Sequence, residues 1–107
     1  MKNFLITGGV GFIGTNLAEE LVRQNHNVIS LDNYSFGSKG NEINGVKYIN
    51  SDIESIDNIK ESVDICFHLA AMARVQPSFE DPEEYFRVNV TGTIKVMEWA
   101  RKNNIKV

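Results

Sequence analysis

A glycine-rich turn near the N-terminus has the residue types and spacing that hold a phosphate group. The segment from Thr7 to Gly14 reads TGGVGFIG, in which Gly9, Gly11 and Gly14 match G-x-G-x-x-G and Gly8 adds a second register, G-x-x-G-x-x-G. Glycine here permits a tight turn, lets the backbone approach a pyrophosphate, and lets a following helix lie close to its strand. The helix N-terminus would present free N–H groups to the phosphates. The turn predicts a dinucleotide site; an ordinary structural turn is the alternative.

An acidic residue, Asp32, stands 18 positions after Gly14. A carboxylate at the end of the next strand can accept hydrogen bonds from both hydroxyls of an adenine ribose. The same charge would repel the 2′-phosphate of NADP, and the first cation after Asp32 is Lys39. NAD is therefore the predicted cofactor rather than NADP, and an exposed loop aspartate is the alternative.

The hydrophobic pattern places this turn between a strand and a helix. Short apolar runs predict buried parallel strands, and apolar residues at helical spacing predict amphipathic helices. The expected strands cover 4–6, 28–31, 46–50 and 63–69, with a fifth beginning at 105–107; the expected helices cover 12–24, 55–61 and 81–103, and 33–45 is a loop. This order predicts an α/β fold, the N-terminal half of a Rossmann-type doubly wound parallel sheet.

Capping residues mark two of the expected helix starts. Asp81 precedes Pro82, which suits the first helical position, and Glu84 stands where it can close a capping box. Ser55 is the expected N-cap of the shorter helix.

The composition fits a single domain spanning residues 1–107. A hydrophobic content of 42% and a net charge of −3 argue against disorder, and 11 basic against 14 acidic residues give no basic face for a nucleic acid. One cysteine excludes an intramolecular disulfide and a cysteine-cluster metal site. No apolar run is long enough to span a membrane and no signal-peptide cleavage pattern is present. We expect a cytoplasmic domain without a metal.

Five motifs follow one another along the chain at spacings typical of one family. They are the glycine-rich turn with Asp32-Asn33, Asp52-Ile53 after the third strand, His68-Leu69-Ala70-Ala71 (H-x-A-A), Ser78-x-x-Asp81-Pro82, and Val88-Asn89-Val90-x-Gly92-Thr93. With them the chain resembles, over essentially its whole length, the extended short-chain dehydrogenase/reductase superfamily. Within it, the chain is similar to NAD-dependent nucleotide-sugar epimerases and dehydratases of the UDP-glucose 4-epimerase type, for which it would be the N-terminal part only.

The resemblance implies a set of cofactor contacts. They are Gly8, Gly11, Phe12, Ile13 and Gly14 at the pyrophosphate, Asp32, Asn33, Ser35 and Gly37 at the adenosine ribose, Asp52 and Ile53 at the adenine, Leu69, Ala70 and Ala71 at the nicotinamide ribose, and Asn89 reaching toward the cofactor. In family members, Arg74, Val75 and Ser78 would approach the sugar nucleotide.

Several of these residues have a structural alternative. Asp52 can cap the helix that follows it, and Asn89 can bond backbone across the sheet. We expect His68 to be a packed residue at a strand end rather than an acid or base, and Cys66 to be a small buried hydrophobe. The apolar residues of 81–103 can be core alone or, as in relatives, part of a helical bundle between two subunits.

The catalytic residues that the resemblance requires are missing from the 107 residues. The family uses a Tyr-x-x-x-Lys pair and an upstream Ser or Thr, which move a sugar hydroxyl proton while hydride passes to the nicotinamide. None of the three tyrosines has a lysine four positions later. In relatives the Ser or Thr follows the fifth strand, and the substrate-binding portion comes later still. We therefore expect a truncated NAD-binding domain without catalytic residues, inactive alone.

Two other functions stay open on the sequence. The chain can be one half of a split epimerase or dehydratase that a partner chain completes, or a non-catalytic Rossmann scaffold. The strand at 63–69 would be a nearly exposed sheet edge, which invites pairing, so we expect a homo-oligomer or a partner chain through this edge and the C-terminal helix. Epimerases, dehydratases and decarboxylases share this half, so the resemblance implies a nucleotide-sugar substrate but no particular sugar.

Overall fold

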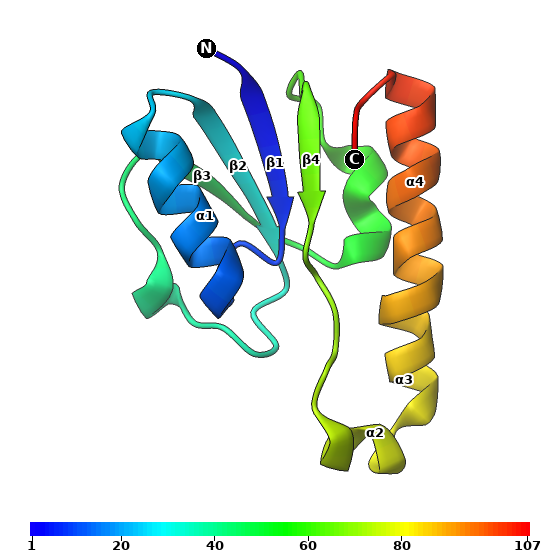
Figure 1. The fold of residues 1–107 in the computed structure, drawn as a ribbon. Helices are drawn as coiled ribbons and strands as arrows, with labels where there is room; N and C mark the ends of the chain where they lie inside the picture. The colour runs from blue at the N-terminus through cyan, green and yellow to red at the C-terminus, as the bar shows by residue number, and fades with distance from the viewer.

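Four parallel strands form one sheet with helices on both of its faces (Figure 1). The computed structural model describes all of residues 1–107. The strands are β1 (Asn3–Thr7), β2 (Asn27–Asp32), β3 (Val46–Asn50) and β4 (Ile65–His68), in the order β3-β2-β1-β4. This is the arrangement expected for the N-terminal half of a Rossmann-type sheet, so the predicted fold class is confirmed.

The helices differ in length and type. They are α1 (Phe12–Arg23), the short 3-10 turns η1 (Lys39–Asn41) and η2 (Ile53–Asn58), α2 (Val75–Glu80), α3 (Pro82–Phe86), the π-helical turn η3 (Arg87–Thr91) and α4 (Gly92–Asn103). None of them is long and apolar enough to cross a membrane.

Two hydrophobic cores lie on opposite faces of the sheet, because successive strand side chains point to opposite sides. Phe4 and Ile6 of β1 pack under α1 with Leu21, whereas Leu5 between them packs with η2 and α4, including Trp99. All of these side chains are less than a tenth exposed. The alternation fixes which face each helix covers and so sets the position of the loops at the strand ends.

The helices around η2 and α2 differ from the sequence expectations. The shorter helix begins at Ile53 rather than Ser55, and Asp52 is its cap, since the Asp52 carboxylate accepts a hydrogen bond from the Glu54 N–H at 3.0 Å. The prediction of Ser55 as N-cap is therefore wrong, because the better-placed carboxylate three residues earlier takes that role. The helix at Val75–Glu80 was not expected, since its six residues are too few to show a helical period.

The C-terminal helical run keeps its expected start but not its full capping box. The Asp81 carboxylate accepts from the Glu84 N–H at 3.3 Å, with Pro82 in the first turn. The Glu84 carboxylate does not return to the Asp81 N–H, because it binds the guanidinium of Arg87 instead. A charged partner gives the stronger bond. The run passes through the π turn and ends at Asn104, which adopts a left-handed conformation with φ 56°.

Residues after α4 pair with the outer edge of β4. The Cys66 N–H donates to the Lys106 carbonyl at 2.8 Å, and the Lys106 N–H donates to the Asp64 carbonyl at 3.3 Å. The expected fifth strand is thus present as a single parallel bridge between Ile65 and Lys106. Beyond this bridge the edge of β4 has no neighbour within the chain.

Two fully buried hydroxyls on neighbouring strands allow a matched test of the packing. Thr7 Oγ1 accepts hydrogen bonds from the N–H groups of Leu69 and Ala70, whereas Ser30 Oγ has no partner. Removing an unpartnered buried hydroxyl relieves its desolvation cost, so Ser30→Ala should raise the free energy of unfolding by about 1 kcal/mol. Thr7→Val should lower it by about 1–3 kcal/mol. Urea denaturation of both variants measures the two changes, and a loss of stability in Ser30→Ala would contradict the assignment.

Candidate functional site

An open pocket lies at the carboxyl ends of the parallel strands. Its empty volume is about 690 Å³, which includes open solvent at the mouth. It is lined by Gly8, Gly11, Leu31, Asp32, Asn33, Ser35, Phe36, Gly37, Ser51, Ile53, Leu69, Ala70, Ala71, Met72, Glu84 and Val88. β1 lies between β2 and β4, so the connections that follow the strands run in opposite directions on the two sides of β1. Open α/β sheets bind ligands at such a point, outside the carboxyl ends of the strands.

Gly8 and Gly37 of the pocket, and Gly14 behind it, stand where a side chain would collide with backbone, whereas a Cβ on Gly11 would have ordinary room. A Cβ atom on Gly14 would overlap the Gly8 carbonyl, and one on Gly37 would overlap the carbonyl of Val10. Gly8 has φ +81°, and a Cβ there would lie 3.0 Å from the Ala70 nitrogen. The absence of side chains therefore lets three backbone segments meet at one point and leaves their polar groups open to a ligand.

The N-terminus of α1 has unused hydrogen-bond donors. Its cap, Gly11, offers no side chain to the first N–H groups of the helix, which have no partner within the helix. Phe12 and Ile13 do not line the pocket; their side chains are 84% and 66% exposed beside it. Backbone amides at such a helix end suit an anionic group.

Asp32 and Asn33 fix the loop after β2. Asp32 accepts hydrogen bonds from the Val10 N–H at 3.1 Å and from the Tyr34 N–H at 2.8 Å. It thereby joins the glycine-rich turn to the loop. Asn33 Oδ1 accepts from both the N–H (3.0 Å) and the hydroxyl (2.7 Å) of Ser35. Each Asp32 oxygen keeps a lone pair for a further donor, so the carboxylate is held in place and can still accept hydrogen bonds from a ligand.

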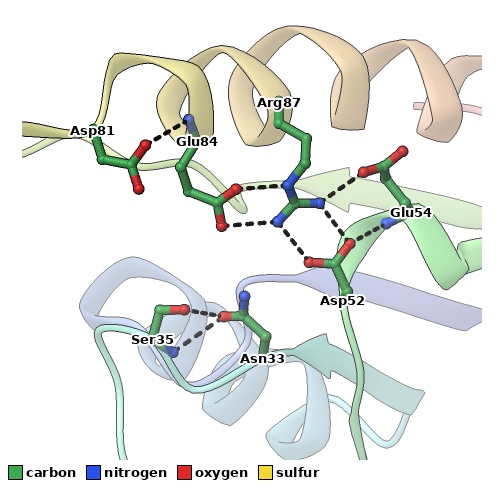
Figure 2. A network of polar contacts seen from close by, with 7 residues as sticks. All are labelled: Asn33, Ser35, Asp52, Glu54, Asp81, Glu84 and Arg87. Atoms are coloured by element: carbon green, nitrogen blue, oxygen red, sulfur yellow. Dashed lines mark hydrogen bonds and ion pairs between the residues drawn. The ribbon is translucent and has the colours of Figure 1, made fainter. Parts of the chain in front are cut away.

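Asp52, expected at the adenine, does not line the pocket, although its neighbours Ser51 and Ile53 do. Figure 2 shows its carboxylate joined to Arg87 by two bonds, of 2.9 and 3.0 Å. Arg87 also binds Glu84, which lines the pocket, and Glu54. The Arg87 guanidinium lowers the pKa of the Asp52 and Glu84 carboxyls. The same bonds, led by that to Glu84, raise the pKa of Arg87.

Asn89 bonds the backbone of the segment after β4. Its Oδ1 accepts from the Met72 N–H at 2.8 Å, and its Nδ2 donates to the Met72 carbonyl at 2.9 Å. The structural alternative for Asn89 is therefore present, and its side chain does not line the pocket. Asn89 affects the pocket through Met72, which lines it.

His68 is a packed residue within a hydrogen-bond chain. Thr93 Oγ1 donates to the Asn89 carbonyl at 2.7 Å, so it can only accept from His68 Nε2, 3.0 Å away. His68 Nδ1 is then the acceptor for the Thr7 hydroxyl at 2.7 Å. Burial lowers the pKa of His68, which favours this neutral form. The chain connects β1, the end of β4 and the helical run behind it.

Six lining residues were not among the cofactor contacts expected from the sequence, although they shape the pocket wall: Leu31, Phe36, Ser51, Met72, Glu84 and Val88. Phe36 lies in the loop after β2, and the Arg74 guanidinium carbon stands 5.2 Å from its ring centroid. This contact connects the loop after β2 with the segment after β4. Arg74, Val75 and Ser78, expected to approach a second ligand, do not line the pocket.

Comparison with known proteins agrees with this geometry. The family model described as the NAD dependent epimerase/dehydratase family matches residues 4–107. The chain belongs to the NAD-dependent epimerase/dehydratase family. The expected resemblance is thus confirmed at the level of the family.

Individual relatives extend well beyond the matched part. A protein of Methanocaldococcus jannaschii, provisionally named a UDP-glucose 4-epimerase, is 39% identical in an alignment 106 positions long, which covers 94% of this chain and 34% of that protein. A UDP-N-acetyl-alpha-D-glucosaminuronate decarboxylase of Bacillus cytotoxicus is 37% identical over 99% of this chain and 35% of its own length. The chain spans about a third of the length of these relatives.

A solved structure shows the same fold in a longer relative. The Thermus thermophilus UDP-glucose 4-epimerase, solved as a complex with NAD, superposes with a TM-score of 0.84 at 31% identity. The match covers 96% of this chain and 35% of that one.

The buried histidine predicts a pH-dependent stability. Because the pKa of His68 is lower in the folded chain than its ordinary value of 6.5, protonation favours the unfolded state. The contribution of neutral His68 to the free energy of unfolding is complete above pH 6.5 and is lost as the pH falls through the lower pKa of the folded chain. The difference in free energy of unfolding between the wild type and His68→Gln should therefore shrink between pH 7.5 and 5. Urea denaturation across this range measures it, with His26→Gln, at the opposite end of β1, as the control. A difference that stays constant with pH would contradict the neutral, bonded His68.

Proposed function

We propose that this chain binds NAD as the cofactor half-site of a nucleotide-sugar epimerase or dehydratase, and that it has no turnover by itself. The observation that carries the proposal is the pocket in which the glycine-rich turn, Asp32 and the small residues after β4 meet. Family membership supports the choice of cofactor. NAD in such a site supplies a hydride acceptor that can return the hydride.

The residues of the pocket fit the parts of a dinucleotide. Gly11, the cap of α1, has no side chain to bond the first N–H groups of the helix, which leaves the start of α1 open to a pyrophosphate, with the amides of Phe12 and Ile13 as donors. Asp32 faces the pocket with free lone pairs for ribose hydroxyls, next to Asn33.

The remaining walls suit the rings at the two ends. Ile53 offers an apolar surface for a base, and Leu69, Ala70 and Ala71 leave room for the nicotinamide ribose. Asp52 would supply an acceptor to the exocyclic amine of adenine from its position beside Ile53.

The absence of turnover follows from the catalytic residues the family requires. No Tyr-x-x-x-Lys is present in the printed sequence, so no side chain here can take the sugar hydroxyl proton in the family's manner. A nucleotide sugar would react only when further polypeptide supplies that pair. Supply by a separate partner chain is a second form of the same proposal, favoured by the open edge of β4 beyond the Ile65–Lys106 bridge.

Calorimetric titration of the chain with NAD tests the proposal. We expect saturable NAD binding and at least tenfold weaker NADP binding, because the Asp32 carboxylate would repel a 2′-phosphate. Asp32→Ala should weaken NAD binding by about tenfold and remove the preference over NADP. A folded chain that binds neither dinucleotide would support the non-catalytic scaffold instead.

We also propose that the outer face of the α3–α4 run is the surface through which two chains associate. Phe86, Val90, Ile94 and Met97 follow one another at helical spacing and are between 42% and 62% exposed. A contiguous apolar stripe of this kind usually marks an interaction surface. Figure 1 shows this run along one side of the molecule, with α1 on the opposite side and the sheet between them.

A charge in the middle of this stripe should separate the two chains. Ile94→Glu is expected to convert a dimer to a monomer, since a carboxylate buried in an apolar interface has no partner. Sedimentation equilibrium measures the mass, and Lys60→Glu, an exposed change of the same sign elsewhere, is the control. A wild type that remains monomeric at high concentration would contradict the proposal.

A further inference from the structure

The turn that leads into β3 contains an asparagine followed directly by a glycine. Asn44 and Gly45 are both exposed, and they precede Val46, the first residue of β3. Gly45 has φ +93°, in the left-handed region, so the turn requires glycine at this position. Glycine also has no Cβ to obstruct an approach of its backbone nitrogen to the preceding side chain. The pair can therefore close a five-membered ring between the Asn44 side chain and the Gly45 nitrogen.

Both reacting groups of this pair are free of hydrogen bonds within the chain. The Gly45 N–H donates to no backbone or side-chain acceptor, and the Asn44 side-chain amide has no partner either. An N–H group fixed in a hydrogen bond keeps its proton and its direction. A free and exposed N–H can lose its proton to hydroxide and turn toward the neighbouring side chain. The fold thus leaves the Gly45 nitrogen available as a nucleophile.

Other exposed asparagines differ from Asn44 in the amide that follows them. The N–H of the next residue donates a hydrogen bond after Asn25, Asn33, Asn41, Asn50, Asn58, Asn103 and Asn104. Asn50 gives the closest comparison, because the next residue, Ser51, is also small. The Ser51 N–H donates to the Asp32 carbonyl at 3.0 Å, so it must leave this bond before it can attack the Asn50 side chain.

We propose that Asn44 is a site of spontaneous deamidation in the folded chain, and that the fold confines the reaction to this asparagine. The Gly45 nitrogen bonds to Asn44 Cγ, the Cγ–Nδ2 bond breaks, and the leaving nitrogen departs as ammonia with the proton of the Gly45 N–H. Water then opens the cyclic imide. Opening at Cγ gives aspartate, and opening at the backbone carbonyl gives isoaspartate. No oxidant or reductant takes part, and an amide is exchanged for a carboxylate.

The product changes the turn rather than the pocket. It has an added negative charge and, as isoaspartate, an added backbone carbon before Gly45. Gly45 lies against α1 at this point, since a Cβ on it would stand 2.8 Å from a Val22 methyl carbon. The turn is at the amino end of β3, whereas the pocket is at the carboxyl ends of the strands. The inference therefore does not depend on the proposed function.

The test compares the native chain with the chain unfolded in urea, both incubated at mildly alkaline pH. Anion exchange separates the products by their added charge, and tandem mass spectrometry after cleavage at lysine locates the modified residue. Cleavage releases the peptide Gly40–Lys47, in which Asn41 is an internal control, because the Glu42 N–H donates to the Lys39 carbonyl. Asn44→Gln, in which a six-membered ring closes far more slowly, and Asn50→Gln are the matched variants.

We expect the native wild type to deamidate at Asn44, with isoaspartate and aspartate as products. Asn50 should react relatively faster in urea, its rate rising against that of Asn44 by about tenfold, the effect of one hydrogen bond that no longer has to break. Asn44→Gln should abolish the acidic product of the native chain, and Asn50→Gln should leave it unchanged. If Asn44 reacts only in urea, the fold protects the turn and the inference is overturned. An equal ratio of the two rates in both conditions would also overturn it, because the hydrogen bonds would then not select the site.

Discussion

The close approach of three backbone segments is the constraint on which the rest of the structure depends. Gly8 lies against Ala70, Gly14 against the Gly8 carbonyl, and Gly37 against Val10, with no space for a Cβ at any of the three glycines. These contacts bring the ends of β1, β2 and β4 to one point and leave a pocket between them. Each segment must also be fixed by other contacts, because glycine permits many backbone conformations and does not select one of them.

The segments are fixed by side chains that form hydrogen bonds with backbone groups rather than with each other. Asp32 holds the glycine-rich turn through the Val10 N–H, Thr7 holds the segment after β4 through the Leu69 and Ala70 N–H groups, and Asn89 holds Met72 by two bonds. The Leu69 N–H also donates to the Thr7 carbonyl. The other bonds satisfy backbone groups that the departure from regular strand geometry would leave unpaired. The backbone around the pocket is therefore held by polar side chains that have their hydrogen-bond partners within the chain itself.

The sequence was sufficient for the features that rest on local chemistry. The glycine spacing, the apolar strands and the Asp81-Pro82 helix start each depend on neighbouring residues, and the structure has all three. The features that it could not predict depend on residues brought together by the fold. Arg87 meets Asp52 across 35 positions, and no local pattern marks that meeting. Glu84 leaves its capping box for a bond to Arg87, three residues later, and α2 is too short to produce a period.

The π turn at Arg87–Thr91 is where these long-range contacts gather. Arg87 reaches back to η2, Asn89 reaches the segment after β4, and Thr93, in the first turn of α4, closes the hydrogen-bond chain through His68 to β1. A π turn places one extra residue in the helix and changes the direction of the side chains around it, and such turns are rare and concentrated at functional positions. One helical run thereby supports both ends of the pocket without lining most of it. The spacing of Arg87 and Asn89 along that run is consequently a structural requirement of the site.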